Sequence, residues 1–238
     1  MKRLDIDYEK IRKAQQIARY CLDNISDFIH PGMTREELHH TCENLMLSKG
    51  STGWWTHDDA ALILFGPHTT YSAHLSPDSM FEGITVLSDD LVTIDVAPMW
   101  EDGWGDMARS YVLENGKVIP WEMSSNPEIV EGMEMEKTLH ECFLNYVDTK
   151  TTFSDIHNMA TRILKEHGYR NCDYHGNYGH SIERHPDNRV TIIPEENRCV
   201  FDYGKPITFE PHIAHINGNL GFKYENMFEF VNGGLTII

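Results

Sequence analysis

Two runs of residues decide the fold of this chain: Leu-Val-Thr-Ile-Asp-Val-Ala-Pro at positions 91–98, and Asp-Met-Ala-Arg-Ser-Tyr-Val-Leu at positions 106–113. A turn around residues 100–105 joins them, so they predict the two strands of a hairpin. Asp95 lies inside the first strand and Asp106 opens the second. A carboxylate inside a strand is costly to desolvate unless it is paired or coordinated. Two such acids across one turn therefore indicate a shared cation.

The composition fits one soluble globular domain, which we expect to cover residues 1–238. The net charge of −17 argues against nucleic acid or an anionic membrane surface as a partner. The chain has no apolar run long enough to span a membrane and nothing like a signal peptide. Its five cysteines form no CxxC pattern, so we expect a reducing, cytoplasmic location.

A helical pattern occurs twice. Apolar residues at helical spacing predict a helix over residues 8–29 and another over about 127–147. Each is followed by a capping-box sequence, Thr34 with Glu37 and Thr152 with Asp155, which predicts a second helix up to a glycine. These starts are 118 residues apart, as are the glycines at 50 and 168. The chain therefore reads as two pseudo-symmetric helix–helix–hairpin halves, about 1–120 and 121–238, although two ordinary helix starts could coincide by chance.

The second half also contains a predicted hairpin, formed by residues 207–211 and 222–228. Asn217 and Gly218 between them are a two-residue turn signal, so paired positions should sum to 435. Glu210 and Glu225 satisfy that sum and would face each other. Like charges placed opposite are destabilising unless a cation lies between them. A loop longer than two residues would make this register approximate.

The four acids Asp95, Asp106, Glu210 and Glu225 suit one or two divalent cations. A nitrogen ligand would favour Mn²⁺, Fe²⁺, Co²⁺ or Zn²⁺ over Mg²⁺ and Ca²⁺. The best candidate is His180, next to Gly179, although spacing alone ranks it only slightly above His175 or His185.

The motifs Thr-Ile-Asp95-Val, Gly-Asp106-Met-Ala-Arg, Gly-His180-Ser-Ile, Phe-Glu210-Pro and Tyr-Glu225-Asn occur in this order. The chain thereby resembles the pita-bread metallopeptidase superfamily of methionine aminopeptidases, Xaa-Pro aminopeptidases, prolidases and creatinase. The similarity covers nearly the whole chain and implies an α+β fold with a curved antiparallel sheet. It also implies two metal ions, bridged by Asp106 and Glu225. Asp95 would bind one ion, and His180 and Glu210 the other.

The resemblance further implies a bridging water that becomes hydroxide near neutral pH, with Glu210 helping to manage its proton. His74 would be the first active-site histidine, with His68 as the alternative. The usual glycines after the metal-binding histidine are replaced by Ser181 and Glu183. The usual second histidine, seven residues after it, is replaced by Asp187, and His185 could take its role or be a surface residue.

The segment after His74 lacks the His-Gly-Ile/Val-Pro sequence of methionine aminopeptidases, so the resemblance is closer to the Xaa-Pro/creatinase branch. That branch usually has an N-terminal domain, for which the sequence before the first helix leaves no room.

An apolar substrate pocket could be lined by Trp54, Trp55 and Trp104, or these side chains could simply pack in the core. His68 and His212 are further candidates for substrate contacts, because strand alternation places His212 on the face of Glu210. The apolar helix faces suit either core packing or a homodimer interface.

We therefore expect a metal-dependent aminopeptidase of Xaa-Pro type, or a related C–N hydrolase, acting on a small peptide or an amino-acid-derived substrate. Two alternatives remain. One is a non-peptidase enzyme on the same fold, such as a metal-independent amidine hydrolase or lyase, which the altered loop after His180 favours. The other is a binding protein without turnover.

Overall fold

Five α-helices and thirteen β-strands are assigned in the computed structural model, which describes residues 6–56, 59–72, 82–173 and 175–238. The helices are α1 (Tyr8–Asn24), α2 (Arg35–Ser48), α3 (Pro127–Tyr146), α4 (Phe153–Glu166) and α5 (Val200–Tyr203). The strands of the first half are β1 (Gly53–Trp54), β2 (Ala61–Phe65), β3 (Asp90–Val96), β4 (Pro98–Trp100), β5 (Gly103–Trp104), β6 (Met107–Glu114) and β7 (Lys117–Ile119). Those of the second half are β8 (Tyr169–Asn171), β9 (Ile207–Phe209), β10 (His212–His215), β11 (Gly221–Lys223), β12 (Asn226–Val231) and β13 (Gly234–Ile237).

The helices begin where the capping residues predict. The side chain of Thr34 accepts a hydrogen bond from the backbone of Glu37, whose carboxylate caps Thr34 in return, and Thr152 and Asp155 do the same for α4. Helix α1 differs from the prediction at its end: it stops at Asn24, and a 3-10 turn over Ile25–Asp27 follows. Such tightening is common at helix ends. Phe28, within the predicted range 8–29, is 47% exposed and contributes no buried surface that would extend the helix.

The first hairpin is confirmed. Strands β3 and β6 pair antiparallel, with β2 and β7 on either side, and Asp95 lies opposite Ala108. The predicted turn is more elaborate than a simple reversal, because β4 and β5 form a short ladder of their own within it. Asp106 immediately precedes β6, at the junction between that ladder and the main sheet.

The second hairpin has the predicted register. His212 pairs with Lys223 and Phe209 pairs with Asn226, so paired positions sum to 435 on both sides of the glutamates. The loop is longer than two residues, since β10 ends at His215 and β11 begins at Gly221. The ladder is interrupted at Glu210 and again before Asn226, which divides each predicted strand into two.

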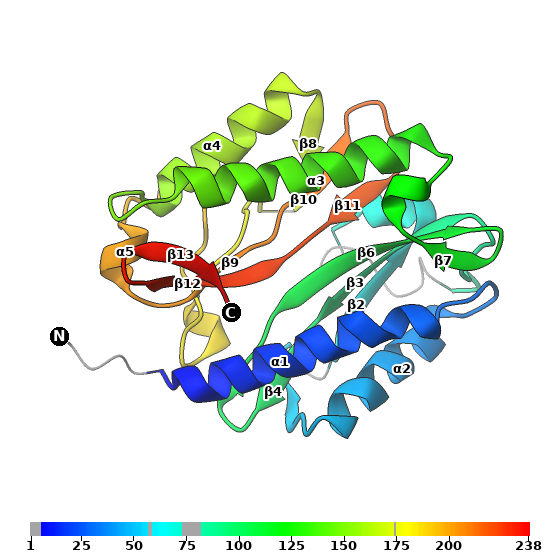
Figure 1. Ribbon diagram of the computed structural model, residues 1–238, viewed down its shortest axis with the longest axis horizontal. Coiled ribbons are helices and arrows are strands. Elements are labelled where there is room, and N and C mark those ends of the chain that lie inside the picture. The colour runs from blue at the N-terminus through cyan, green and yellow to red at the C-terminus, as the bar shows by residue number, and fades with distance from the viewer. Residues whose placement is uncertain (1–5, 57–58, 73–81, 174) are drawn as a thin grey trace.

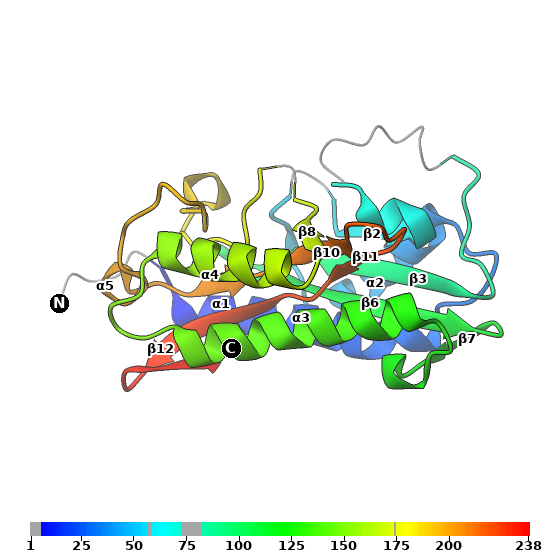
Figure 2. The ribbon, with the colours of Figure 1, turned by 90° about the horizontal axis from the view of Figure 1, so that it is seen from above.

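Helices α1 and α2 lie at one edge of the molecule and α3 and α4 at the opposite edge, with the strands between them (Figure 1). In the perpendicular view, α3 lies on one side of β10 and β11, while the loop-rich segment 175–199 reaches to the other side (Figure 2). The amide of Glu225 donates to the carbonyl of Ala108, and the hydroxyl of Ser110 bonds the backbone of Lys223. The two hairpins therefore meet at β6, which brings their acids together. The division into two related halves remains a prediction.

Candidate metal centre

The five predicted ligands lie together where the two hairpins meet. Oxygen and nitrogen atoms of Asp106, His180 and Glu225 lie within 4.8 Å of one another, and the same is true of oxygens of Asp95, Glu210 and Glu225. The two clusters share Glu225. The arrangement matches two neighbouring cation sites with one common carboxylate.

Asp106 is held from the first helix. Buried Gln15 of α1 donates from Nε2 to the carbonyl of Asp106 and accepts from its amide, both at 2.9 Å. This close approach needs Gly105, where an added Cβ would lie 2.8 Å from the backbone of Ala14. The Asp106 side chain is thereby directed at Nε2 of His180, 3.2 Å away.

The backbone around His180 orients its ring. The His180 amide donates to Oγ1 of Thr208, and Nδ1 lies 3.2 Å from the carbonyl of Ser181. Such a contact fixes the tautomer and leaves Nε2 as the ligating atom. Nε2 lies 3.5 Å from Oε1 of Glu210 as well as near Asp106. The ring centre of His180 is 6.2 Å from Trp55 and 5.8 Å from Trp104, so these indoles form one wall of the centre.

A lysine that we did not predict enters the second cluster. The ammonium Nζ of Lys223 contacts Oδ2 of Asp95 and lies 3.1 Å from Oε2 of Glu210. The strand pattern contained the signal, because alternation places position 223 on the same face as Glu225. The register places it opposite His212, whose ring Nε2 donates to the carbonyl of Thr69 at 2.6 Å.

Burial governs the charges in this centre. It raises the pKa of Asp95 to about 6, although the Lys223 ammonium opposes the shift. Burial likewise raises the pKa of Asp106, against the effect of His180. For Glu210 the attraction of Lys223 and His180 outweighs burial, and its pKa is lowered. The pKa of Lys223 is well above its usual value, because the attraction of the acids outweighs its own burial.

A bound cation would strongly stabilise the carboxylate of Glu225. It is fully buried, neither of its carboxylate oxygens has a hydrogen-bond partner among the described residues, and burial raises its pKa well above the usual value. Its backbone is fixed by Arg109, which donates to the Glu225 carbonyl and to the side chain of Asn226 and stacks on Tyr224. Glu225 is a buried acid without a hydrogen-bond partner among the described residues, and it belongs to both clusters. Divalent cations would supply the missing partners.

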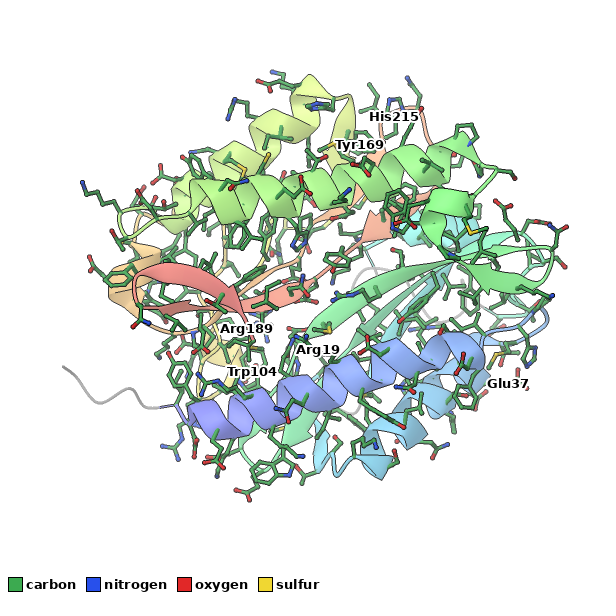
Figure 3. The ribbon with its side chains drawn as sticks, viewed as in Figure 1. Arg19, Glu37, Trp104, Tyr169, Arg189 and His215 are labelled. Atoms are coloured by element: carbon green, nitrogen blue, oxygen red, sulfur yellow. The ribbon has the colours of Figure 1, made fainter. Side chains whose placement is uncertain are left out.

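Trp55 and Trp104 lie beside the cluster as a pair, with ring centres 4.9 Å apart, and the Arg189 guanidinium lies 4.7 Å from the Trp55 ring centre. Figure 3 labels Trp104 and Arg189, which lie near one another in that view. Arg189 was not anticipated, and nothing in its local sequence marks it. Trp104 is only 1% exposed and packs in a core cluster, so of this pair only half-buried Trp55, beside Arg189, is accessible.

Other predicted residues lie elsewhere. Trp54 packs against the core of the first half. His68 lies close to the carboxylate of Asp90, which is at the opposite end of β3 from Asp95. His185 is exposed where a 3-10 turn begins. His74 falls outside the described residues.

The altered loop after His180 has a structural explanation. The hydroxyl of Ser181 donates to Glu183 at 2.7 Å and accepts from the amide of Val190. Glu183 is also bonded by Tyr203 and by the ammonium of Lys205. The residues that replace the usual glycines therefore form a buried polar network behind the centre.

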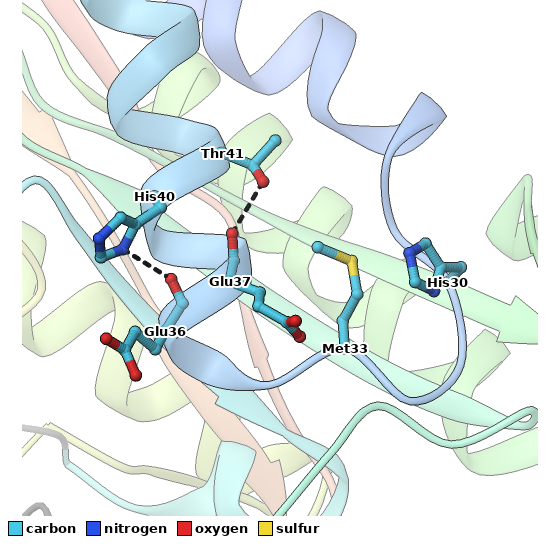
Figure 4. A pocket seen from close by; sticks show the side chains of 6 residues that line it. All are labelled: His30, Met33, Glu36, Glu37, His40 and Thr41. Atoms are coloured by element: carbon cyan, nitrogen blue, oxygen red, sulfur yellow. Dashed lines mark hydrogen bonds between the residues drawn. The ribbon is translucent and has the colours of Figure 1, made fainter.

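Two further features lie on the outer side of α2. His39, His40 and Glu43 form a third group with metal-ligand atoms in reach of one another, but His39 already contacts Asp59 at 2.8 Å. A cavity of about 440 Å³ lies nearby, lined by His30, Met33, Glu36, Glu37, His40 and Thr41 (Figure 4). His40 and Thr41 bond carbonyls of their own helix. Neither feature contains the buried, unpartnered acid that distinguishes the main centre.

Comparison with known proteins identifies the family. The model of metallopeptidase family M24 matches residues 9–231. The chain belongs to metallopeptidase family M24. It is 23% identical over 233 residues to an uncharacterized peptidase of Staphylococcus aureus, a match that covers 98% of this chain and 60% of that protein. This M24 chain thus spans about 60% of the length of that curated relative.

The M24 chain also resembles solved structures. The prolidase from Pyrococcus furiosus superposes with a TM-score of 0.77 at 20% identity, over 96% of this chain and 62% of that one. The methionine aminopeptidase from Thermotoga maritima gives 0.75 at 15% identity, over 100% of this chain and 98% of that one. These likenesses confirm the expected pita-bread fold. The family match confirms the expected superfamily.

No helix in the described part of the chain is both long and apolar enough to cross a membrane.

Proposed function

We propose that this M24 protein is a metal-dependent hydrolase that cleaves the C–N bond after the first residue of a small peptide, as an aminopeptidase of Xaa-Pro type does. The observation that carries the proposal is Glu225, a buried carboxylate without a partner that is common to two clusters of ligand atoms. Such a group is costly to bury unless a cation binds it.

The two clusters would hold two divalent ions. Asp106 and Glu225 would be shared by both ions. Asp95 would bind one of them, and His180 and Glu210, whose Nε2 and Oε1 lie 3.5 Å apart, would bind the other. The mixture of carboxylates with one imidazole suits Mn²⁺, Fe²⁺, Co²⁺ or Zn²⁺. Bound there, the ions would lower the pKa of a water and make it a nucleophile near neutral pH.

The protein's own groups would position the reactants. Glu210 has a lowered pKa, so its Oε1 is ionised at neutral pH and available to take a proton from the attacking water. The acids around it would attract the ammonium or imino group of a peptide's first residue. Half-buried Trp55 would pack against an apolar side chain, with buried Trp104 behind it, and Arg189 would meet a carboxylate or carbonyl further along the substrate.

The structure gives the non-peptidase alternative less support than the sequence did. It depended on Ser181 and Glu183, and their buried hydrogen bonds account for these residues without different chemistry. We also propose a reducing, cytoplasmic location, since all five cysteines are free. The homodimer that the apolar helix faces suggest is likewise a proposal.

The test is metal analysis combined with a panel of Xaa-Pro and methionyl peptides. We expect two equivalents of a transition metal, with cleavage lost on chelation and restored on adding metal back. Asp106→Ala should lose metal from both positions if Asp106 bridges them. An active protein that contains no metal would favour the amidine hydrolase or lyase, and a protein with neither metal nor turnover would favour a binding role.

A further inference from the structure

The third group of metal-ligand atoms, on α2, shares no residue with the centre between the two hairpins. One ligand atom each of His39, His40 and Glu43 lies within 4.8 Å of the other two. Residues three and four positions apart are neighbours on the surface of a helix, so Glu43 lies one turn beyond both histidines and on their side of α2. The helix by itself therefore brings the three donors together.

The ring of His40 is oriented by its own helix. Nδ1 of His40 lies 3.0 Å from the carbonyl oxygen of Glu36, one turn earlier (Figure 4). A carbonyl oxygen only accepts hydrogen bonds, so Nδ1 carries the proton of the neutral ring. Nε2 then has the lone pair that a metal ion requires.

The ring of His39 is oriented from outside the helix. Its Nε2 lies 2.8 Å from Oδ1 of Asp59 and 3.2 Å from the amide nitrogen of Ala60. The carboxylate makes the shorter, charge-assisted contact, so Nε2 donates to it and Nδ1 has the lone pair. A histidine held by a carboxylate through its other nitrogen is the usual arrangement at protein metal sites. The contact with Asp59 therefore prepares His39 to bind an ion.

The donor set and its exposure suit zinc. The side chain of His39 is 24% exposed, Glu43 is half-buried and His40 is exposed, so ions and water reach the group from solvent. Two imidazoles and one carboxylate, with water in the fourth position, are a donor set that zinc uses in proteins. Mg²⁺ and Ca²⁺ prefer oxygen ligands throughout, so the two imidazoles disfavour them.

We propose that His39, His40 and Glu43 form a separate zinc site, with Asp59 as the residue that orients His39. Asp59 lies two residues before β2, so a bound ion would hold α2 against the segment that leads into that strand. The role is structural. The site goes beyond the proposed function and does not depend on it, because the two sites have no ligand in common.

The experiment is a calorimetric titration of the metal-free protein and its variants with Zn²⁺. His40→Gln should bind one equivalent fewer than the wild type, whatever number the centre between the hairpins binds. Glu43→Gln should lose the same equivalent. Asp59→Asn should keep it with an affinity about 10- to 100-fold lower, the usual effect of losing an orienting carboxylate.

The matched control is His30→Gln. His30 is also exposed and lines the same cavity as His40, but it does not belong to the third group. This variant makes the same chemical change and should bind as many equivalents as the wild type. Equal Tm values of all variants in chelator would show that each of them is folded.

The same number of equivalents in the wild type, His40→Gln and Glu43→Gln would overturn the site. So would an equal loss in His30→Gln, because binding would then be spread over surface histidines. One equivalent in the wild type and none in His40→Gln would support this site and contradict the dinuclear centre, so the failures of the two proposals are distinguishable.

Discussion

Replacing Glu225 with glutamine tests the metal centre most directly, because the chain contains a natural control for it. Glu136 of α3 is also buried, also has both carboxylate oxygens unpartnered among the described residues, and also has a pKa raised well above the usual value by burial. It belongs to neither ligand cluster. Glu225→Gln and Glu136→Gln therefore make the same chemical change at two buried carboxylates, of which only Glu225 lies among other acids.

Without metal, both variants should be more stable than the wild type near pH 8. A buried acid whose pKa is raised favours folding below its unfolded pKa, and that contribution is lost as the pH rises toward the folded pKa. Glutamine is uncharged and removes this loss. The gain should be roughly 1–3 kcal/mol, the cost of an unsatisfied buried group. It should shrink as the pH falls toward about 4.3, the ordinary pKa of glutamate.

With metal, the variants should separate. An ion at a concentration 100 times its Kd stabilises the folded state by about 2.7 kcal/mol. For a chain of this size each kcal/mol raises the Tm by roughly 2–4 °C, so the wild type should gain roughly 5–10 °C. Glu136→Gln should gain as much, whereas Glu225→Gln should gain less than about 2 °C.

The assay is thermal unfolding by calorimetry at pH 8, with chelator or with Mn²⁺, for all three proteins. If Glu225→Gln kept the full metal-dependent rise, or if Glu136→Gln lost it equally, the assignment of Glu225 as the shared ligand would be refuted.

Three further changes test the surrounding structure. Burial lowers the pKa of His140 to about 3, so the neutral ring's contribution to stability is present above about pH 6.5 and is lost as the pH falls toward 3. His140→Gln should reduce the loss between pH 8 and pH 5 by about 2 kcal/mol, measured by urea unfolding, and an unchanged slope would show that this imidazole does not resist protonation. In Gly221→Ala the new Cβ would lie 2.1 Å from the carbonyl oxygen of Thr69, so we expect a loss of about 1–3 kcal/mol, and equal Tm values would contradict the close approach. Glu183→Ala removes the carboxylate that pairs with the Lys205 ammonium and should cost about 3 kcal/mol, while the double variant with Lys205→Met should recover part of it; no recovery would mean that the pair is not coupled.

Much of this arrangement depends on local rules, which is why the sequence alone determined it. Thr34 and Thr152 start helices because their hydroxyls satisfy free amides of the first turn, an interaction within four residues. Side chains alternate strictly along a strand, so the register of the second hairpin placed Glu210 opposite Glu225 despite a longer loop. The family, and the ligand set that we propose, were inferred from residues in short motifs that occur along the chain in the order typical of the family.

Tertiary structure decided what fills the space between those elements. Strand alternation places Lys223 on the face of Glu225, but its contact with Asp95 exists only because two hairpins more than a hundred residues apart meet at β6. Gln15 holds Asp106 from a helix whose sequence reads only as an apolar face. Such contacts depend on distances between elements that are far apart in the chain. Periodicity identifies which face of an element is buried, but only packing determines which atoms of another element that face meets.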